Sequence, residues 1–194
     1  MKKTIILFTA AFLAALTTTA AALQQQQQTL SDKMVRLHVV ANSDTREDQL
    51  LKLRVRDAIL AVTEEADTLQ QLQSLLPEVE RVAKMCLECN GSDYRVSVSL
   101  QKENFPTRVY ETFSLPAGAY TALRVTIGAG KGQNWWCVAF PSICMCAVSE
   151  FEEAAQTAGF TDDEVKLMME ESERYVLRFK ALELLQQFKE LIWS

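Results

Sequence analysis

The spacing of hydrophobic residues changes several times along the chain, and each spacing predicts a different element. The segment Val35 to Ala41 (VRLHVVA) is short and rich in β-branched residues, which predicts a strand. Apolar residues then recur at helical spacing from about Thr45 to Ala66, as in an amphipathic helix. Asn42, Ser43 and Asp44 lie between the two. They suit a helix N-cap, because their side-chain oxygens can accept hydrogen bonds from free backbone N–H groups.

A second helical pattern runs from Leu69 to Ala83, and Pro77 predicts a break or kink in it near Leu76. Asn90-Gly91 is a stop and turn signal, and the period changes after it. From Tyr94 to Leu100 apolar and polar residues alternate, which is typical of a strand with one buried face.

Three further strands are predicted, over Thr107–Phe113, Tyr120–Ile127 and Asn134–Phe140. Short connections between successive strands favour an antiparallel meander, and the glycine-rich loop between the last two strands is predicted to be a tight hairpin. The first strand and the two helices are expected to pack on this antiparallel sheet, with further helices at the C-terminus. The predicted fold class is therefore α+β.

The N-terminal residues predict export. Lys2-Lys3, the apolar run Ile5 to Leu16 and Ala20-Ala21-Ala22 follow one another in the order of a secretory signal peptide cleaved after Ala22. An uncleaved membrane anchor is the alternative, because Thr4 to Leu23 is about long enough to span a bilayer. Gln24 to Gln28 has low complexity and is most simply a flexible spacer.

From Ala147 onward the chain is acidic and has a helical pattern. Thr161 is the predicted N-cap of a short helix, with Glu164 completing a capping box. Leu182, Leu185, Phe188 and Ile192 form the apolar stripe of a last helix, which we expect to dock on the domain. The predicted organisation is a signal peptide at residues 1–22, a flexible Gln-rich spacer at 23–33, an α+β domain at 34–146 and an acidic helical region docked on that domain at 147–194.

Composition narrows the classes of function. Hydrophobic residues make up 48% of the chain and charged residues 23%, which is ordinary for a globular protein. The net charge of -5 provides no electrostatic attraction to nucleic acid or to anionic lipid, so neither is an expected partner. Contact with a membrane is expected only through the signal peptide or an uncleaved anchor.

The glycine loop around Gly128, Gly130 and Gly132 does not fit a nucleotide site. A phosphate loop needs Ser or Thr directly after its lysine, whereas Lys131 is followed by Gly132. The dinucleotide fingerprint fails as well, because the glycines follow G-x-G-x-G spacing. We therefore expect no cofactor.

The five cysteines suggest a disulfide rather than a metal site. Cys86 and Cys89 resemble a redox pair or half of a zinc site, but they lie at the end of a predicted helix, where the helix dipole does not lower a thiol pKa. No second close-spaced Cys-x-x-Cys completes a zinc site, so no metal is expected. Cys137 and Cys144 would lie outside the reducing cytoplasm with a Pro-Ser turn between them, which predicts that they pair.

The single histidine, His38, lies in a predicted strand. It could form a Ser-His-Asp triad with Ser43 and Asp44 only through a tortuous local geometry, so a structural role is favoured. Acidic pairs such as Asp162-Asp163 fall on predicted solvated helix surfaces. The residues themselves indicate no enzyme.

Three segments carry a resemblance to a known family. They are VRLHVVANSDTREDQLLKLRVRDAIL, LPAGAYTALRVTIGAGKGQNWWCVAFPSIC and VLRFKALELLQ. Together they resemble the stage II sporulation protein R family, and the resemblance extends over most of the chain after the glutamine run. Cys86 and Cys89 are not part of the family pattern.

This resemblance implies an exported signalling protein of endospore formation. Members of the family are exported by the forespore into the space between the two membranes that separate it from the mother cell. There they are required to activate a membrane-embedded aspartic peptidase, which removes the pro-sequence of the mother-cell factor sigma-E. An exported thiol oxidoreductase that uses Cys86 and Cys89 is the alternative from another class, and replacement of both cysteines by serine would separate the two hypotheses.

For a signalling protein the expected site is a contact surface. Trp135 and Trp136 should point to opposite faces of a strand, so one can enter the core while the other faces out beside the glycine loop. The predicted contact residues are Asn42, Ser43, Asp44, Gly130, Lys131, Gly132, Trp135 and Trp136. Two structural alternatives stay open: both tryptophans can be core residues, and the Asn42 to Asp44 segment can serve only as a helix cap.

Overall fold

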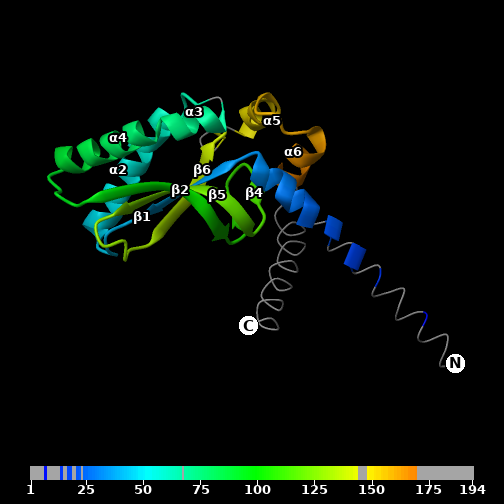
Figure 1. Cartoon of the computed structure of the whole chain (residues 1–194), viewed down its shortest axis with the longest axis horizontal. Helices are drawn as coiled ribbons and strands as arrows, with labels where there is room; N and C mark the ends of the chain where they lie inside the picture. Colours follow the sequence, from blue (N-terminus) through cyan, green and yellow to red (C-terminus); the bar gives the residue numbers. More distant parts are fainter. Residues whose placement is uncertain are drawn as a thin grey trace.

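The computed structural model describes residues 24–66, 68–143 and 148–169, together with positions 7, 14, 17, 18, 21 and 22. A four-stranded sheet carries helices on one face, and shorter elements gather at one of its ends (Figure 1). In chain order the elements are β1 (Val35–Val40), α2 (Arg46–Thr63), α3 (Leu69–Ser74), α4 (Leu76–Cys89), β2 (Val96–Phe105), β3 (Arg108–Val109), β4 (Ser114–Leu115), β5 (Gly118–Ile127), β6 (Asn134–Phe140), α5 (Val148–Thr157) and α6 (Asp162–Met169).

The sheet has the strand order β2-β5-β1-β6 and is mostly antiparallel, so the predicted α+β class is confirmed. β1 pairs in parallel with β5 and antiparallel with β6. All six residues of β1 are buried, as expected for a strand with a neighbour on each side and cover on both faces. The predicted hairpin between β5 and β6 is wrong, because β1 lies between these two strands and the glycine loop must cross its end.

The segment Thr107–Phe113 does not continue this sheet, as the meander prediction required. Its residues Arg108–Val109 form β3, which pairs only with β4 in a separate two-stranded sheet. The turn between them is closed by a hydrogen bond from Tyr110 N to Phe113 O at 2.7 Å. The strand predicted from Tyr94 to Leu100 is confirmed, and as β2 it continues to Phe105 against the whole length of β5.

The helix boundaries follow local capping chemistry. α2 begins after Thr45, whose hydroxyl accepts a hydrogen bond from Asp48 N. The predicted break near Pro77 is confirmed, because α3 ends at Ser74 and Pro77 lies in the first turn of α4, where a missing N–H removes no intrahelical bond. α4 stops at Asn90, followed by Gly91 with φ of 74°.

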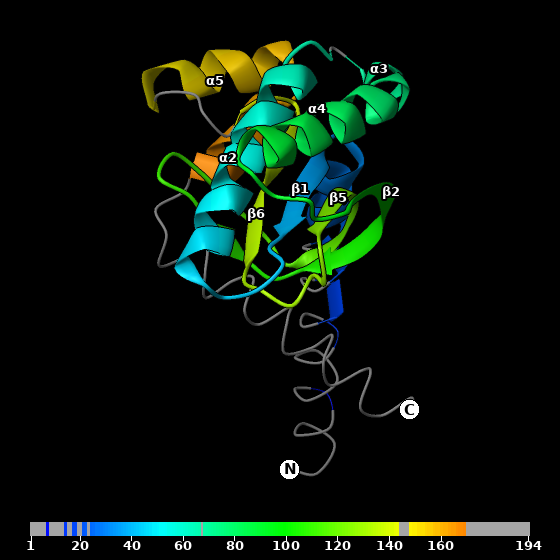
Figure 2. The same cartoon turned by 90° about the vertical axis from the view of Figure 1, so that its left-hand side faces the viewer.

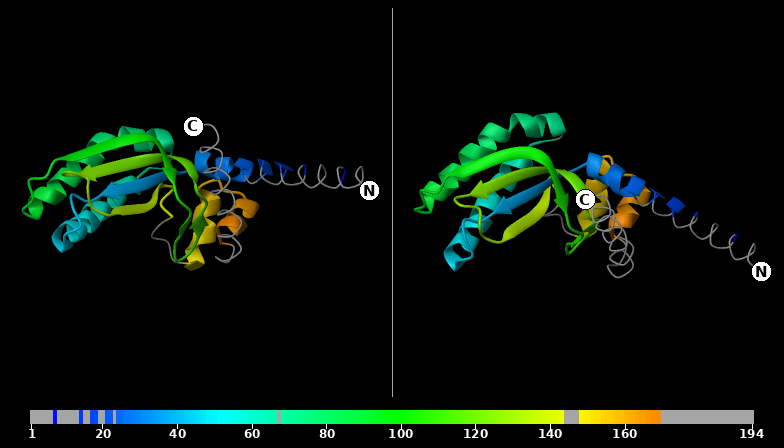
Figure 3. Two further views of the ribbon diagram at one scale, coloured as in Figure 1. Left: turned by 90° about the horizontal axis from the view of Figure 1, so that it is seen from below. Right: turned by 60° about the horizontal axis from the view of Figure 1, so that its bottom comes forward.

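One face of the sheet is covered by α2 and α4, which lie side by side across the strands (Figure 2). The core between them is built from the apolar residues of alternating strand positions and of the inward helix faces. Its fully buried members include Leu37, Val39, Val55, Ile59, Leu72, Val79, Ala83, Leu87, Leu123 and Val125. In the left-hand view of Figure 3, which shows the molecule from below, the strands lie in front of these helices and show the opposite face.

A second core fills one end of that opposite face. It joins Phe105, Tyr120 and Val138 from the sheet to Phe151 of α5 and Met168 of α6. Leu30 also belongs to it, and it comes from a helical stretch at residues 24–32 in which Gln27 is buried too. The segment expected to be a flexible spacer therefore has a helical conformation, with Gln27, Leu30 and Ser31 on its buried side.

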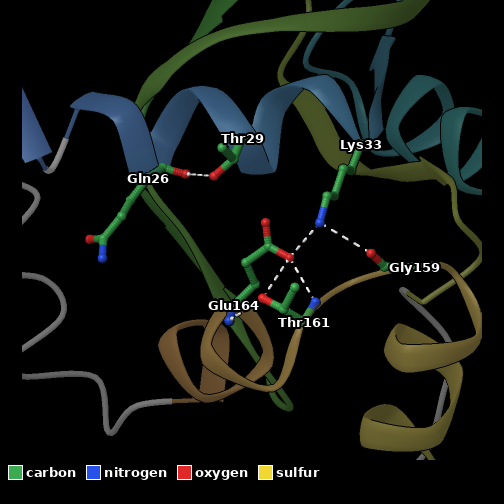
Figure 4. A network of polar contacts seen from close by, with 6 residues as sticks. All are labelled: Gln26, Thr29, Lys33, Gly159, Thr161 and Glu164. Carbon is green, nitrogen blue, oxygen red and sulfur yellow. Dashed lines mark hydrogen bonds and ion pairs between the residues drawn. The ribbon is translucent and has the colours of Figure 1, made fainter.

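Polar contacts tie the start of β1 to α6 (Figure 4). Lys33 Nζ lies 2.6 Å from Glu164 Oε2 and donates a second hydrogen bond to Gly159 O at 3.1 Å. The same carboxylate accepts from Thr161 N at 2.7 Å, and Thr161 Oγ1 accepts from Glu164 N at 3.4 Å. The predicted capping box is therefore confirmed, and it also connects α6 to the main sheet.

Three predictions fall mostly on residues outside the described part of the chain. They are the processing of the N-terminus after Ala22, the partner cysteine Cys144 and the last helix with its stripe from Leu182 to Ile192. Within the described segments, we find no helix with the length and apolar character needed to cross a bilayer.

Candidate functional site

Two groups of predicted contact residues that are distant in the sequence meet at one edge of the sheet. β1 and β5 are parallel, so the loops that follow them leave the sheet on the same side. We call residues 41–45 and 128–133 together the double loop. Backbone hydrogen bonds join its halves, from Gly132 N to Ala41 O at 2.9 Å and from Lys131 N to Asn42 O at 3.1 Å.

The side chains of Asn42 and Asp44 also hold the double loop together. Asn42 Oδ1 accepts from Ala129 N at 2.9 Å, and Asp44 Oδ1 accepts from Gln133 N at 2.7 Å. The N-cap of α2 is Thr45, so the cap interpretation is wrong for the preceding residues. The side-chain oxygens of Asn42 and Asp44 instead satisfy backbone N–H groups of the glycine loop, whereas Ser43 Oγ accepts from Thr45 N at 3.3 Å.

Asp48 is a buried residue of this site that the sequence analysis misses. Ser43 Oγ donates to Asp48 Oδ2 at 2.5 Å, and Asn42 Nδ2 donates to the same oxygen at 2.8 Å. The hydrogen bond from Ser43 is the main cause that lowers the pKa of Asp48, with help from Asn42 and against the opposing effect of burial. The spacing Thr45-x-x-Asp48 is that of a capping box, and this signal could have identified the residue.

The glycines of the double loop are required by its geometry. Gly128 and Gly130 have φ of 56° and 60°, which L-residues with side chains rarely adopt. A Cβ atom at Gly132 would lie 2.2 Å from Ser43 O, so the two backbones approach this closely only because position 132 has no side chain. The loop is thus a fixed scaffold that presents the exposed side chain of Lys131 at the edge of the sheet.

Trp135 and Trp136 point to opposite faces of β6, as predicted. Trp135 packs against the core under α2, and the Arg56 guanidinium lies 4.3 Å from its ring centroid. Trp136 packs against the second core, and the Arg108 guanidinium lies 3.9 Å from its ring centroid. Both tryptophans are half-buried, so neither is a wholly internal or a freely exposed residue. Each indole is instead covered on one side by an arginine.

A pocket of about 550 Å³ lies between β3 and β6. Its walls are the side chains and backbone of Arg108, Val109, Tyr110, Gln133, Asn134, Trp135 and Trp136. The pocket therefore begins at the double loop, since Gln133 belongs to both, and continues along β6 past the two tryptophans. The predicted contact residues and this pocket form one continuous edge of the molecule.

His38 lies on the face of the sheet opposite α2 and α4, and its structural role is supported by its contacts. Its Nδ1 lies 2.6 Å from Glu103 Oε2, while Arg124 and Gln101 donate to the other oxygen of Glu103 at 3.2 and 2.8 Å. Burial alone would raise the pKa of Glu103, but these hydrogen bonds hold it below its ordinary value of 4.5. Ser43 donates to Asp48 instead of His38, so the three residues form no catalytic triad.

Comparison with known proteins identifies the family. The family model for stage II sporulation protein R matches residues 31–150, which include the main sheet, its covering helices and the double loop. The chain belongs to the stage II sporulation protein R family. Stage II sporulation protein R from Bacillus subtilis (strain 168) is 37% identical over 131 residues, which cover 63% of this chain and 58% of that relative. The match thus spans little more than half of the relative's length, and no solved structure matches the chain.

The thiols of this family member differ in state. Cys137 is disulfide-bonded, whereas Cys86 and Cys89 at the end of α4 are free. The expected partner Cys144 lies outside the described residues, so the pairing stays a prediction. Burial is the main cause that raises the pKa of the Cys86 thiol, which disfavours the thiolate. Among the described residues, no group of three or more His, Cys, Asp and Glu side chains is arranged to hold a metal ion.

Proposed function

We propose that this protein is an exported signal of endospore formation. It leaves the forespore, enters the space between the two membranes and activates the membrane-embedded aspartic peptidase that processes pro-sigma-E in the mother cell. The observation that carries this proposal is family membership, because the family match covers the main sheet and the helices packed on it. The basic, apolar and small-residue order at the N-terminus supports export.

The thiol oxidoreductase alternative has weaker support from the structure. A catalytic thiol needs a lowered pKa, which a helix N-terminus or a nearby cation provides. Cys86 lies in the last turn of α4, and its pKa is raised by burial. We therefore propose a protein that acts by binding rather than by chemical conversion.

We place the peptidase contact on the double loop and the adjoining part of β6. Lys131 would touch the partner directly, because its backbone is fixed and its side chain is exposed. Asn42 and Asp44 are positioning residues in this proposal, since their oxygens are engaged with the glycine loop. A preformed loop loses little conformational entropy when it binds, which favours a contact of useful affinity.

The experiment is reconstitution in cells that do not sporulate. Cells that produce the peptidase and pro-sigma-E receive either the full chain or residues 23–194, which lack the proposed signal peptide. Immunoblots should show processed sigma-E only with the exported chain. The variant in which serine replaces both Cys86 and Cys89 should support normal processing of pro-sigma-E. Lys131→Glu should reduce processing, while Lys102→Glu, an exposed change on the far edge strand β2, should not. Absence of processing with the full chain, at normal levels of all three proteins, would refute the proposed function.

A further inference from the structure

The pocket between β3 and β6 contains a cation, Arg108, that has no counter-charge among the described residues. The Arg108 side chain lies over Trp136, and its Nε is buried without a hydrogen-bond acceptor. No ion pair joins Arg108 to an acidic residue in the described part of the chain. A buried polar group without a partner is costly, so an acceptor supplied on binding would lower this cost.

Neighbouring groups increase the attraction of this pocket for an anion. Arg36 is fully buried against Phe105, Tyr110 and Tyr120, and it also has no acidic partner among the described residues. Burial is the main cause that lowers the pKa of Arg108; Tyr110 opposes this effect, and repulsion by the charge of Arg36 adds to it. A carboxylate in the pocket would relieve this repulsion and pair with Arg108.

A second donor without a partner lies on the other side of β6. Trp135 Nε1 is buried and has no acceptor, although Trp135 also borders the pocket. β6 is the last strand of the four-stranded sheet, so an extended segment can lie beside the start of this strand, at Asn134 and Trp135, where the strand borders the pocket. Successive side chains of such a segment point to opposite faces. Arg108 and the Trp135 indole also lie on opposite sides of β6, so neighbouring side chains of the segment could reach one each.

We propose that this pocket binds an acidic, extended segment of the activated peptidase, with a carboxylate paired to Arg108 and a neighbouring acceptor bonded to Trp135 Nε1–H. The inference rests on the proposed function, because it takes the peptidase as the partner. It adds to that function the statement that the recognised segment is acidic and extended. Val109, which is 52% exposed at the rim, provides an apolar contact beside the carboxylate.

The proposal predicts that binding and stability respond differently to one substitution. Arg108→Gln removes a cation that has no acidic partner among the described residues and only the Trp136 ring beside it, so the melting temperature should change by no more than about 2 °C. In the complex the same change leaves a carboxylate unpaired, so the concentration for half-maximal activation should rise at least about tenfold. Trp135→Phe keeps the ring but removes the donor, and a rise of several-fold is expected.

The measurement uses the exported protein, added to proteoliposomes that contain the peptidase and pro-sigma-E. Arg81→Gln is the matched control, because Arg81 is paired with Glu78 on the exposed surface of α4 and should leave activation unchanged. Failure of the wild type to activate refutes the proposed function. Activation by the wild type and by Arg108→Gln at equal concentrations refutes only the carboxylate pocket.

One further variant, and a series of substitutions in the peptidase, test for a purely structural role. Arg108→Lys retains a cation over Trp136 but lacks Nε, so a structural arginine would be rescued by lysine whereas the carboxylate contact would be only partly restored. A melting temperature that falls with glutamine and recovers with lysine, together with full activity of the lysine variant, would overturn the inference. Acidic residues in the exported segments of the peptidase are then replaced by glutamine one at a time. At least one of these peptidase variants must lose as much activation as Arg108→Gln does, and the two substitutions together must cause no greater loss than either one alone. Additive losses at every position would also overturn the inference.

Discussion

On the face of the sheet that α2 and α4 cover, β1 and β5 contribute Leu37, Leu123 and Val125, all of which are 0% exposed. On the opposite face the same two strands contribute Arg36, His38 and Arg124. The first face packs against the helices through apolar contacts, which do not depend on a specific hydrogen-bond or charge partner. On the second face, charges and aromatic rings depend on groups from other strands, as when Glu103 of β2 meets His38 of β1.

This difference separates what stabilises the fold from what is available for recognition. Apolar burial contributes free energy in proportion to the area removed from water, so the covered face should dominate stability. The opposite face includes cations without acidic partners in the described residues, namely Arg36 and Arg108, and the burial of each carries a desolvation cost. Such groups are suited to binding, where a partner can supply the missing charge.

The largest expected effect is on the covered face. Leu37→Ala removes a fully buried side chain from the middle of β1, and the cavity should lower the free energy of unfolding by about 2–5 kcal/mol. Ser99→Ala on the opposite face of β2 is the matched control and should change it by no more than about 0.5 kcal/mol. Urea unfolding followed by tryptophan fluorescence measures both, and equal costs for the two variants would contradict the division between the faces.

The covered face was also the easier one to predict. The sequence alternates between apolar and polar residues from Tyr94 to Leu100 and has helical spacing from Thr45 to Ala66. Each pattern predicts an element with one buried side, and the structure confirms both elements. The order of the strands could not be predicted in the same way. β1 enters the sheet between β5 and β6, and nothing local in the glycine loop distinguishes a tight hairpin from a crossing.

The site was predicted in part. Trp135 and Trp136 on opposite faces follow from the period of a strand, but their arginine neighbours come from α2 and β3 and have no local signal. The cap explanation of the Asn42 to Asp44 segment was wrong, because the side chains of Asn42 and Asp44 accept hydrogen bonds from a loop that lies far along the chain. The role of this segment as a contact surface stays a prediction. Long-range pairs such as these depend on topology, which a single sequence does not determine.

A smaller effect is expected from removing the buried cation on the second face. Arg36→Met loses the hydrogen bonds to Cys137 O at 3.1 Å and to Tyr110 Oη at 2.7 Å, but it also removes the cost of burying a charge. The two effects oppose each other, so the free energy of unfolding should fall by about 1–2 kcal/mol, less than for Leu37→Ala. Urea unfolding tests this, and a loss of more than about 4 kcal/mol would mean that Arg36 is as important to folding as the apolar core.

The smallest effect concerns the pH dependence that the second face should confer. The pKa of Glu103 in the folded protein lies below its ordinary value of 4.5, so the unfolded chain binds a proton more readily than the folded one. The stabilisation by this carboxylate is therefore complete above about pH 4.5 and is lost as the pH falls through the lowered pKa. Glu103→Gln should cost about 1 kcal/mol at pH 7, and this difference from the wild type should shrink in acid.

Unfolding in urea from about pH 3 to pH 7 measures this difference for both proteins. Glu78→Gln is the matched control, because Glu78 pairs with Arg81 at the surface of α4, where solvent screens the interaction. Parallel stability curves for the wild type and Glu103→Gln over this range would show that the hydrogen bonds to Glu103 from His38, Gln101 and Arg124 do not stabilise the fold. The polar part of the second face would then be retained for binding alone, and the contrast between the two faces would be sharper than proposed.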